Sequence, residues 1–407
     1  MQCGLLGRKL GHSYSPQIHA LLADYSYTLF EKEPEELETF LKCGNFSGIN
    51  VTVPYKQAVI PYLDTLTPLA TKLGAVNTIV RKGEKLIGHN TDYFGFQYML
   101  KQLSMEISGK KALVLGSGGA SKTVCAVLQD QGSQVVVISR NGEHNYDNLS
   151  NHTDAALIVN TTPVGMYPEV GHAPLSLTGF PKLEGVLDVI YNPARTALLL
   201  EAERLGIPAL NGLSMLVAQA KEAAEWFSGV SISNETIQPI LNRLEQDMKN
   251  IVLIGMPGCG KSTIGKILSA KTGRKLVDAD AAIVERARKS IPEIFAEDGE
   301  TAFRALETEI LSTLGKQSGL IIATGGGCVT KNRNFPLLHQ NGSIFWIQRN
   351  LEALATDGRP LSQANPLEQM YRIRKPMYTA FADFCVSNNT SPEIAAETIL
   401  TILEGQR

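Results

Sequence analysis

Residues Ile251-Val-Leu-Ile-Gly-Met-Pro-Gly-Cys-Gly-Lys-Ser262 join a run of apolar, partly β-branched residues directly to a glycine-rich turn. The segment satisfies the pattern GxxxxGK[ST], and a helical stretch, 264–271, follows it. The glycines let backbone N–H groups surround a polyphosphate, the lysine adds a positive charge, and the serine hydroxyl suits a Mg²⁺ shell. The segment therefore predicts a phosphate-binding loop at the end of a parallel strand, with ATP and Mg²⁺ as its ligands.

A second apolar run, residues 113–115, also opens into a glycine-rich turn, Gly116-Ser-Gly-Gly-Ala120, and a helix through residue 128. This pattern is typical of a dinucleotide cradle, although it lacks the full GxGxxG spacing. The next strand, 135–138, ends at Ser139-Arg140, where an NAD site usually carries an acidic residue. Because an arginine suits a 2′-phosphate, the pair predicts NADP as the cofactor.

Strand-length apolar runs alternate with helical patterns at 112–115, 135–138, 156–159, 251–254, 320–323 and 344–347. This rhythm predicts α/β folds with parallel sheets. The 407 residues exceed one average domain, and two phosphate cradles indicate two catalytic units. We expect the boundary at 246–250, between a helical stretch over 235–247 and the strand from Ile251, and so short a linker predicts restricted relative positions.

The composition predicts a folded chain without a global charge that would attract nucleic acid or membrane. Hydrophobic residues make up 43% and charged residues 19%, and 38 basic against 40 acidic residues leave no basic field for nucleic acid or membrane. The six cysteines form no CxxC pair, which argues against a disulfide framework or a zinc site. The first residues lack the apolar core of a signal peptide, and no apolar run has the length of a membrane span. We expect a cytoplasmic protein without nucleic acid or membrane partners.

Acceptor-binding candidates follow the phosphate-binding loop. Residues 276–280 predict a strand that ends in Asp278 and Asp280, whose carboxylates would share one face of an extended segment and point toward metal and acceptor. Next come Phe303-Arg304, Ala323-Thr-Gly-Gly-Gly327, Asp357-Gly-Arg359-Pro-Leu and Arg374-Lys-Pro-Met-Tyr378. Arginines bind carboxylates and phosphates through paired hydrogen bonds, and a triglycine lets the backbone approach a small ligand closely.

In these motifs, taken in order, residues 250–407 resemble shikimate kinase. The resemblance implies a nucleoside monophosphate kinase-like P-loop domain with a five-stranded parallel sheet, which transfers phosphate from ATP to the 3-hydroxyl of shikimate. It implies catalytic roles for Lys261, Asp280 and Arg359 and a Mg²⁺ site at Ser262 and Asp278. The implied nucleotide-binding residues are Gly258, Cys259, Gly260, Ser262 and Thr263, and the implied substrate-binding residues are Arg304, Gly325, Gly326, Gly327 and Arg374. Arg359 would stand on a mobile lid, and the sequence just before it lacks the further arginine of many relatives.

Four further motifs precede the dinucleotide cradle: Gly11-His-Ser13-Tyr-Ser15-Pro, Asn50-Val-Thr52-Val-Pro-Tyr-Lys56, Gly74-Ala-Val-Asn77-Thr and Gly88-His-Asn-Thr-Asp92. A structural interpretation makes Ser15 the N-cap of one helix and Asp92 the cap of a helix from Tyr93, and leaves Lys56 solvated. A functional interpretation is compatible with it. Hydroxyls at a helix entrance bind a carboxylate, and a lysine beside an aspartate in a cleft forms a proton-handling pair.

With these motifs, residues 1–247 resemble shikimate dehydrogenase, and the later segments Asn160-Thr-Thr-Pro-Val-Gly-Met, Tyr191-Asn-Pro and Gly212-Leu-Ser-Met-Leu-Val-Ala-Gln-Ala extend the match. The resemblance implies reversible hydride transfer between NADPH and 3-dehydroshikimate, with Lys56 and Asp92 as catalytic residues. The implied substrate-binding residues are Ser13, Ser15, Thr52, Asn77, Tyr191 and Gln219. The implied cofactor-binding residues are Gly116, Ser117, Gly118, Gly119, Ala120, Ser139, Arg140, Gly212 and Met215. The implied architecture is an α/β substrate domain of residues 1–95 plus 212–247, with a Rossmann-like NADP-binding domain, 96–211, inserted between.

The sequence departs from the shikimate dehydrogenase pattern at two places, and two alternative functions stay open. The chain between Asn141 and Ala156 is short, which predicts that one helix and one strand of the nucleotide-binding domain are missing, and His144 stands where a second cation would help NADP. We expect a bifunctional enzyme that makes shikimate and then phosphorylates it. One alternative is a quinate/shikimate dehydrogenase that uses NAD. The other is that one half is catalytically weak and serves as a binding or regulatory module.

Overall fold

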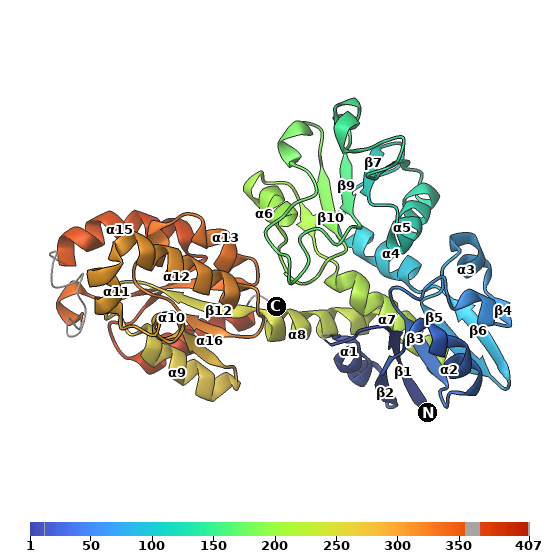
Figure 1. Ribbon diagram of the computed structural model, residues 1–407, viewed down its shortest axis with the longest axis horizontal. Helices are drawn as coiled ribbons and strands as arrows, with labels where there is room; N and C mark the ends of the chain where they lie inside the picture. Colours follow the sequence, from blue (N-terminus) through green and yellow to red (C-terminus); the bar gives the residue numbers. More distant parts are fainter. Residues whose placement is uncertain (12, 355–366, 406–407) are drawn as a thin grey trace. The chain divides into compact units, whose positions relative to one another are not determined.

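The computed structural model describes residues 1–11, 13–354 and 367–405. Its contacts divide the chain into two compact units (Figure 1). The first unit consists of Met1–Val164, Ala173–Tyr191 and Glu201–Leu241, and the second of Gly165–His172, Asn192–Leu200 and Asn242–Arg407. Two sheets belong to the first unit and one sheet to the second.

The first sheet has six strands in the order β2-β1-β3-β5-β6-β4. The strands are β1 (Gln2–Gly7), β2 (Ser26–Glu31), β3 (Gly48–Val51), β4 (Thr65–Leu66), β5 (Thr78–Lys82) and β6 (Lys85–His89). β1 pairs in parallel with both β2 and β3, whereas β5 is antiparallel to β3 and β6. The helices of this region are α1 (Ser15–Leu22), α2 (Leu37–Cys43), α3 (Pro68–Leu73) and α4 (Asp92–Gln102). Because β3 and β6 both neighbour β5, the segments that follow them reach the same part of the unit.

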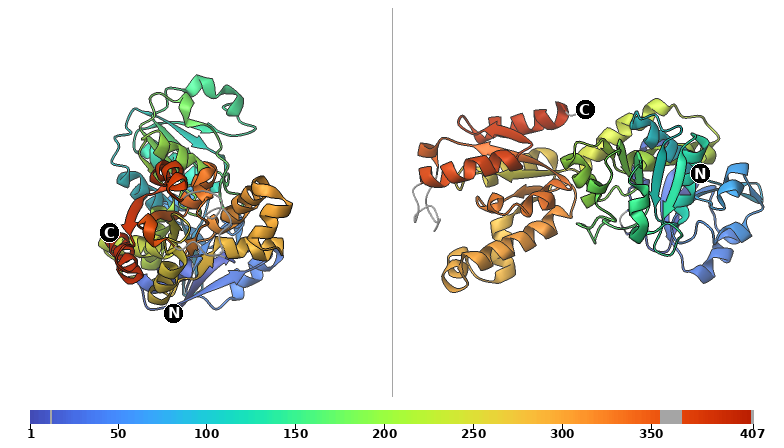
Figure 2. Two further views of the ribbon diagram at one scale, coloured as in Figure 1. Left: turned by 90° about the vertical axis from the view of Figure 1, so that its left-hand side faces the viewer. Right: turned by 90° about the horizontal axis from the view of Figure 1, so that it is seen from above.

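The second sheet is a five-stranded parallel sheet with the order β11-β10-β9-β7-β8. Its strands are β7 (Lys111–Leu115), β8 (Gln134–Ile138), β9 (Leu157–Asn160), β10 (Gly185–Asp188) and β11 (Ala209–Leu210), with α5 (Gly119–Asp130) after β7 and α6 (Ala197–Arg204) after β10. Figure 2 shows the two sheets of this unit by colour, blue for the first and cyan to green for the second. The doubly wound fold has the strand order 3-2-1-4-5-6, in which β8, β7, β9, β10 and β11 correspond to strands 2, 1, 4, 5 and 6. Strand 3 of that order is missing among the described residues.

The shortened connection after β8 explains this gap. Between β8 and β9 the structure has only the 3₁₀ helix η3 (Tyr146–His152), so β8 stands at the edge of the sheet. The expectation of a missing helix and strand is confirmed.

Helix α7 (Leu213–Ser228) returns from the second sheet to the first. Gly95 of α4 lets the two helices approach closely, since a Cβ there would lie 2.7 Å from the Met215 carbonyl oxygen. At its other end the Phe227 ring fills the space over Gly48 of β3. Helix α8 (Ile237–Met248) follows and passes from the first unit into the second.

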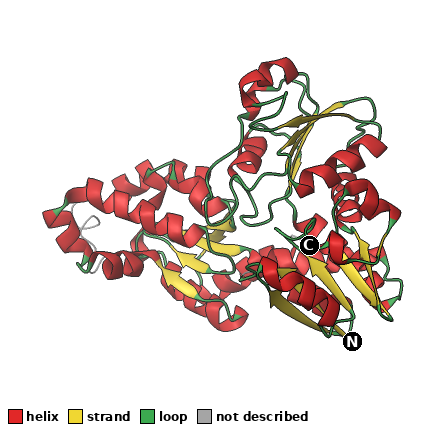
Figure 3. Cartoon of the chain, turned by 45° about the vertical axis from the view of Figure 1, so that its right-hand side comes forward, coloured by secondary structure: helices red, strands yellow, loops and turns green. Residues whose placement is uncertain are grey.

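The second unit is built on a five-stranded parallel sheet with the order β13-β14-β12-β15-β16. Its strands are β12 (Asn250–Ile254), β13 (Leu276–Asp278), β14 (Ile321–Ala323), β15 (Gly342–Gln348) and β16 (Phe384–Ser387). The helices are α9 (Lys261–Thr272), α10 (Ala279–Ala287), α11 (Ile291–Glu297), α12 (Gly299–Gly315), α13 (Asn334–His339), α15 (Leu367–Phe381) and α16 (Pro392–Gly405). Helices cover the strands of both units, as the colouring by secondary structure shows (Figure 3). The strands expected from the sequence are present, with ends that differ by one or two residues.

Candidate active sites

Lys56 and Asp92 form an ion pair in the first unit. The Lys56 Nζ lies 2.6 Å from the Asp92 Oδ2, and 20% and 11% of the two side chains are exposed. Lys56 follows β3, and Asp92 is the first residue of α4, separated from the end of β6 by two residues. The expectation that Asp92 caps a helix from Tyr93 is wrong, because the N-cap is Thr91 and Asp92 already lies within α4. Its carboxylate is therefore available to the lysine.

Asn77, Thr91 and Gln219 form a hydrogen-bonded group beside this pair. The Asn77 Nδ2 donates to the Thr91 Oγ1 at 3.0 Å, and the Thr91 backbone N–H donates to the Asn77 Oδ1 at 2.7 Å. The Thr91 hydroxyl lies 3.4 Å from the Gln219 Oε1, which joins α7 to the start of α4. The structure thus brings two sequence-predicted residues together through Thr91, which the motif Gly88–Asp92 contains but to which no role was assigned.

Ser13 and Ser15 stand at the entrance of α1. The Ser15 backbone N–H donates to the Ser13 Oγ at 3.3 Å. The expected N-cap role of Ser15 is wrong, because Tyr14 is the N-cap residue and Ser15 is the first residue of the helix. The Tyr191 ring meets the Tyr14 ring edge to face at 6.1 Å, so Tyr191 lies close to this entrance. Burial raises the pKa of the Tyr191 hydroxyl, which keeps it a neutral hydrogen-bonding group.

Thr52 extends this region along the first sheet. Its backbone N–H donates to the Leu6 carbonyl oxygen at 2.9 Å, which continues the pairing of β1 and β3 past the end of β3. The Thr52 side chain is half-buried. It stands four residues before Lys56, at the edge from which that lysine also comes.

The cradle after β7 has the conformation that a phosphate site needs. Gly116 has a φ of +104°, and a Cβ there would lie 3.0 Å from the Thr161 Oγ1. Gly118 is the N-cap of α5 and, like Gly119, has open space where a side chain would be. Together with Ser117 and Ala120 these residues leave the N-terminus of α5 open, which fits a pyrophosphate.

Gly212 and Met215 lie at the start of α7. A Cβ on Gly212 would be 2.0 Å from the Val189 carbonyl oxygen, so only glycine lets α7 begin this close to the chain after β10. Met215 is 8% exposed and packs in the core of the second sheet. Packing alone therefore explains a glycine at position 212 and an apolar residue at position 215.

The turn after β8 holds Ser139 and Arg140. The Ser139 backbone N–H donates to the His144 carbonyl oxygen at 3.1 Å, which closes the turn, and the Arg140 side chain is exposed. The His144 Nδ1 lies 3.1 Å from the His152 Nε2, so this ring is held by a second imidazole. Arg140 thus stands as an exposed cation in this turn.

In the second unit, β12 ends in the glycine-rich loop that the sequence predicts. Gly255, Gly258 and Gly260 have φ values of +146°, +83° and +100°, which favour glycine. The Lys261 Nζ donates to the carbonyl oxygens of Gly255 at 2.9 Å and Met256 at 3.0 Å. The loop therefore curls around its own lysine, a shape that suits a polyphosphate.

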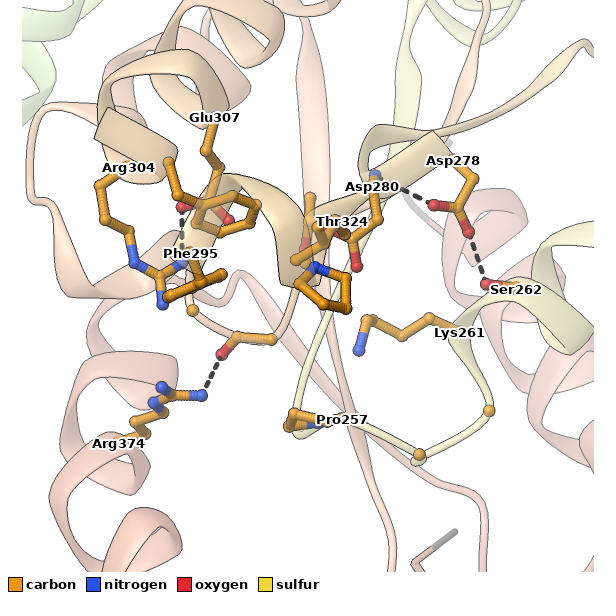
Figure 4. A pocket seen from close by; sticks show the side chains of 18 of the residues that line it. Pro257, Lys261, Ser262, Asp278, Asp280, Phe295, Arg304, Glu307, Thr324 and Arg374 are labelled. Atoms are coloured by element: carbon orange, nitrogen blue, oxygen red, sulfur yellow. Dashed lines mark hydrogen bonds and ion pairs between the residues drawn. The ribbon is translucent and has the colours of Figure 1, made fainter. Parts of the chain in front are cut away.

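Ser262 and Asp278 face one another across this loop. The Ser262 hydroxyl donates to the Asp278 Oδ2 at 2.7 Å (Figure 4). The Asp278 Oδ1 accepts the backbone N–H of Asp280 at 3.0 Å and caps α10. The expectation that both aspartates share a face of an extended segment is wrong, because β13 ends at Asp278 and Asp280 lies in the first turn of α10. A hydroxyl and a carboxylate remain a donor set that suits Mg²⁺.

Charged side chains line the far side of the same cavity (Figure 4). Arg304 is 4% exposed, and its Nη1 lies 2.9 Å from the Glu307 Oε2. The Arg374 Nη1 donates to the Gly326 carbonyl oxygen at 3.1 Å. Burial raises the pKa of the Glu307 carboxyl, and the neighbouring Arg304 opposes that shift. Two buried cations beside a carboxylate fit an acidic, hydroxylated ligand.

The triglycine lies between these groups. A Cβ at Gly325 would lie 2.6 Å from the Asp280 Oδ1, and one at Gly327 would lie 2.3 Å from the Arg304 guanidinium. The cavity has a volume of about 480 Å³. It contains every sequence-predicted residue of this unit except Cys259, whose side chain is fully buried under the loop, and Arg359, which lies outside the described residues.

Several lining residues were not predicted from the sequence. They are Pro257, Ile291, Pro292, Phe295, Phe303, Glu307, Thr324 and Arg349. Glu307 lies one helical turn from Arg304 on α12, a spacing that could have indicated its role as an ion-pair partner. The apolar members carry no such signal, because apolar residues on short helices usually belong to a core.

Comparison with known protein families agrees with this geometry. Residues 5–79 match the family model described as shikimate dehydrogenase substrate binding domain, and residues 257–404 match the model of shikimate kinase. Among the described residues, none of the helices is both long enough and apolar enough to cross a membrane.

Individual relatives match the N-terminal part. The chain is 35% identical over 264 residues to the shikimate dehydrogenase (NADP(+)) of Clostridium perfringens, which covers 60% of this chain and 97% of that protein. It is 39% identical over 254 residues to the shikimate dehydrogenase (NADP(+)) of Caldanaerobacter subterraneus, with 56% and 91% covered.

Solved structures give the same result. Shikimate dehydrogenase 1 from Peptoclostridium difficile covers 60% of this chain and 97% of its own, with 38% identity and a TM-score of 0.56. The Thermus thermophilus shikimate 5-dehydrogenase in complex with NADP(H) and shikimate covers 60% and 99%, with 30% identity and a TM-score of 0.54. The chain belongs to the shikimate dehydrogenase family in its N-terminal part and carries a shikimate kinase domain in its C-terminal part, so one polypeptide has both enzyme activities.

Proposed function

We propose that this enzyme reduces 3-dehydroshikimate to shikimate with NADPH and then phosphorylates the 3-hydroxyl of shikimate with ATP. The observation that supports the sequence of reactions is the pairing of two sites in one chain. The first unit contains the Lys56–Asp92 pair and a dinucleotide cradle, and the second contains buried arginines in one cavity with a phosphate-binding loop. The alcohol made in the first reaction is the acceptor of the second.

In the reduction, Lys56 serves as the proton donor. NADPH supplies the hydride when it is bound, and a ketone oxygen that gains negative charge then needs a proton. The Lys56 ammonium provides this proton, and the Asp92 carboxylate, at 2.6 Å, holds the ammonium in place. The proton that Lys56 loses returns from solvent, because part of its side chain is exposed.

Substrate recognition in the first unit uses neutral hydrogen-bonding groups. Ser13 and Ser15, at the entrance of α1, bind the carboxylate of the acid, a group favoured by free N–H groups at a helix N-terminus. The ring hydroxyls are held by the side chains of Thr52, Asn77, Tyr191 and Gln219. Asn77 and Gln219 are already oriented by Thr91, which reduces the entropy cost of binding.

The cofactor lies along the cradle after β7. Gly116, Ser117, Gly118, Gly119 and Ala120 hold the pyrophosphate, Ser139 and Arg140 bind the 2′-phosphate, and Gly212 and Met215 lie near the nicotinamide. The open N-terminus of α5 and the exposed Arg140 support this placement.

In the phosphorylation, Asp280 orients the attacking hydroxyl. Its position beside Gly325 supports this role. Arg304 and Arg374 bind the carboxylate of shikimate together with Gly326 and Gly327, with which they line one cavity. ATP supplies the phosphoryl group and Mg²⁺ neutralises its charge when they are bound. Lys261 with Gly258, Cys259, Gly260 and Thr263 holds the phosphates, Ser262 and Asp278 hold the metal, and Arg359 stabilises the charge that moves.

We also propose the domain boundaries 1–95 plus 212–247, 96–211 and 250–407. The packing of Phe227 of α7 over Gly48 of β3 supports the assignment of α7 to the substrate domain. Separate expression of residues 1–249 and 250–407 tests the last boundary, since α8 contributes residues to the second unit.

A single assay tests the proposed function. Purified protein is mixed with 3-dehydroshikimate, NADPH, ATP and Mg²⁺, and loss of NADPH and formation of ADP are followed together. We expect both signals, with ADP formation lagging behind NADPH oxidation. NADPH loss without ADP would refute the kinase step, and quinate oxidation with NAD at a higher kcat/KM than shikimate oxidation with NADP would refute the dehydrogenase assignment.

A further inference from the structure

Arg349 lies in the kinase cavity but belongs to none of the motifs that the sequence singled out. It follows β15 directly, its side chain is half-buried, and it lines the cavity together with Gly258, Gly260 and Lys261 of the phosphate-binding loop. An arginine in such a place needs a partner for its charge, because a partly desolvated cation without one is costly.

The other two arginines among the described lining residues already have partners. Arg304 pairs with Glu300 and Glu307, and Arg374 donates to the Gly326 carbonyl oxygen. No hydrogen bond or ion pair joins Arg349 to another residue that the structure describes. Its guanidinium therefore keeps its donors for a ligand of the cavity, and a guanidinium selects carboxylates and phosphates.

The sheet order shows which end of the cavity Arg349 serves. β12, which leads into the phosphate-binding loop, lies between β14 and β15. Asp280, Arg304 and the triglycine follow β13 and β14, on one side of that loop, and Arg349 is the first residue after β15, on the other. Arg374, on α15, also comes after β15 but contacts the triglycine through the Gly326 carbonyl oxygen. A ligand at Arg349 is therefore separated from Asp280 by the loop itself.

The register places Arg349 at the height of the loop. Ile254 of β12 pairs with Trp346 of β15, so Arg349 is as many residues past its strand pairing as Pro257 is past its own. A Cβ on Gly255 would lie 2.5 Å from the Ile347 carbonyl oxygen, which shows how closely the two segments run.

We infer that Arg349 binds the triphosphate of ATP from the side of the loop opposite the acceptor. It adds a second fixed cation to Lys261 and thereby sets the affinity of the kinase unit for the nucleotide. This inference rests on the proposed kinase function and deepens it by naming a residue that recognises the phosphates.

Calorimetry on the full-length protein tests the binding role. The ligands are the non-hydrolysable imido analogue of ATP and adenosine, and the variants are Arg349→Gln, Arg349→Lys and the control Arg333→Gln, an exposed arginine outside the cavity. We expect Arg349→Gln to weaken the affinity for the ATP analogue by roughly ten- to a hundredfold, the effect of losing one charge-assisted hydrogen bond. Arg349→Lys should recover part of this loss, while adenosine affinity and the Arg333 variant should not change.

Steady-state kinetics give a second readout. Arg349→Gln should raise the KM for ATP and leave the KM for shikimate in the kinase reaction and the rate of NADPH oxidation as in wild type. The unchanged KM for shikimate also shows that the kinase cavity is folded. Unchanged analogue affinity would overturn the inference, as would an equal loss of adenosine binding, which indicates contact with the base. A rise in the KM for shikimate alone would also overturn it. If wild type formed no shikimate-dependent ADP, the proposed function would fail, while analogue binding would still test Arg349.

Discussion

Lys56 and Asp92 are 36 positions apart in the sequence, yet their charged atoms lie 2.6 Å from one another. Lys56 reaches the site from the end of β3 and Asp92 from the first turn of α4, and β5 stands between the two strands that deliver them. A partly exposed surface pair would contribute little to stability. A pair shielded to this extent is suited to moving a proton.

Replacement of Lys56 by Ala should therefore lower NADPH oxidation by about 10²–10⁴-fold, the usual contribution of a general acid. Phosphorylation of added shikimate should continue at the wild-type rate, because the kinase cavity contains no residue of this pair. Lys72→Ala is a matched control, since Lys72 pairs with Asp130 at an exposed position. An unchanged reductase rate in the Lys56 variant would exclude this lysine as the proton donor.

Substitutions in the kinase cavity should lower phosphoryl transfer and leave NADPH oxidation unchanged. Lys261→Ala should lower kcat/KM for phosphoryl transfer by about 10²–10³-fold, because it removes the loop cation that stabilises developing charge. Asp280→Asn should also lower this kcat/KM, because Asp280 is proposed to orient the attacking hydroxyl. Both variants should oxidise NADPH normally, as measured by absorbance. Loss of both activities from either variant would show that the two units are not independent.

Arg140→Ala should raise the KM for NADPH by about tenfold or more, since it removes a charge-assisted contact with the 2′-phosphate. The KM for 3-dehydroshikimate should stay close to wild type, and the KM for NADH, which lacks that phosphate, should also be unaffected. The comparison of the two cofactors is the decisive measurement. Equal increases for NADPH and NADH would refute the role of Arg140.

Gly95→Ala should loosen the contact between α4 and α7, because the new Cβ would meet the Met215 carbonyl oxygen at 2.7 Å and the Gln219 Cβ at 2.9 Å. We expect a loss of about 1–3 kcal/mol in the free energy of unfolding of the first unit, as for other overpacked sites. The KM for shikimate in the dehydrogenase reaction should rise as well, because Gln219 moves away from Thr91. Gly179→Ala is the control, because nothing lies within 4 Å of a Cβ there.

Acidification should destabilise the first unit in a defined range. Burial lowers the pKa of His19 to about 3 and that of His89 to about 4, from an ordinary value of 6.5. Below pH 6.5 the unfolded chain binds protons that the folded chain refuses, so stability is complete above that pH and falls as the pH drops toward 4 and then 3. The slope approaches about 1.4 kcal/mol per pH unit for each histidine.

Urea unfolding at several pH values measures this effect. His19→Gln should flatten the dependence between pH 6 and 4, whereas His172→Gln, at an exposed position, should leave it as in wild type. An identical pH profile for the His19 variant and wild type would contradict the assignment.

Much of the fold was predictable because each strand carries its own apolar run and each cradle its own glycines. The run 251–254 and the loop through Ser262 required a parallel strand, a turn of positive φ and a helix, and β12 and α9 follow that order. The short segment after Arg140 likewise predicted the missing strand, because too few residues remain to form it. Local chemistry decides these features, so sequence alone was sufficient for them.

The sequence patterns gave wrong predictions at the starts of two helices, where contacts with neighbouring residues decide which residue caps the helix. Asp278 and Asp280 were expected on one extended face, but the side chain of Asp278 caps α10 and places Asp280 on a helix. Tyr14, not Ser15, proved to be the N-cap of α1. One residue of difference at a helix start changes which groups are free, and the sequence patterns resolve boundaries less finely than that.

The sequence by itself determined the two cradles, the candidate catalytic residues and the family resemblance, since these depend on residue types at short spacing. Only the tertiary structure decided that Thr91 joins Asn77 to Gln219, that Glu307 pairs with Arg304 inside the cavity, and that Arg349 stands beside the phosphate-binding loop. These relationships join distant segments, or depend on which face of an element turns inward. Strand order and helix packing set them, and no local pattern encodes either.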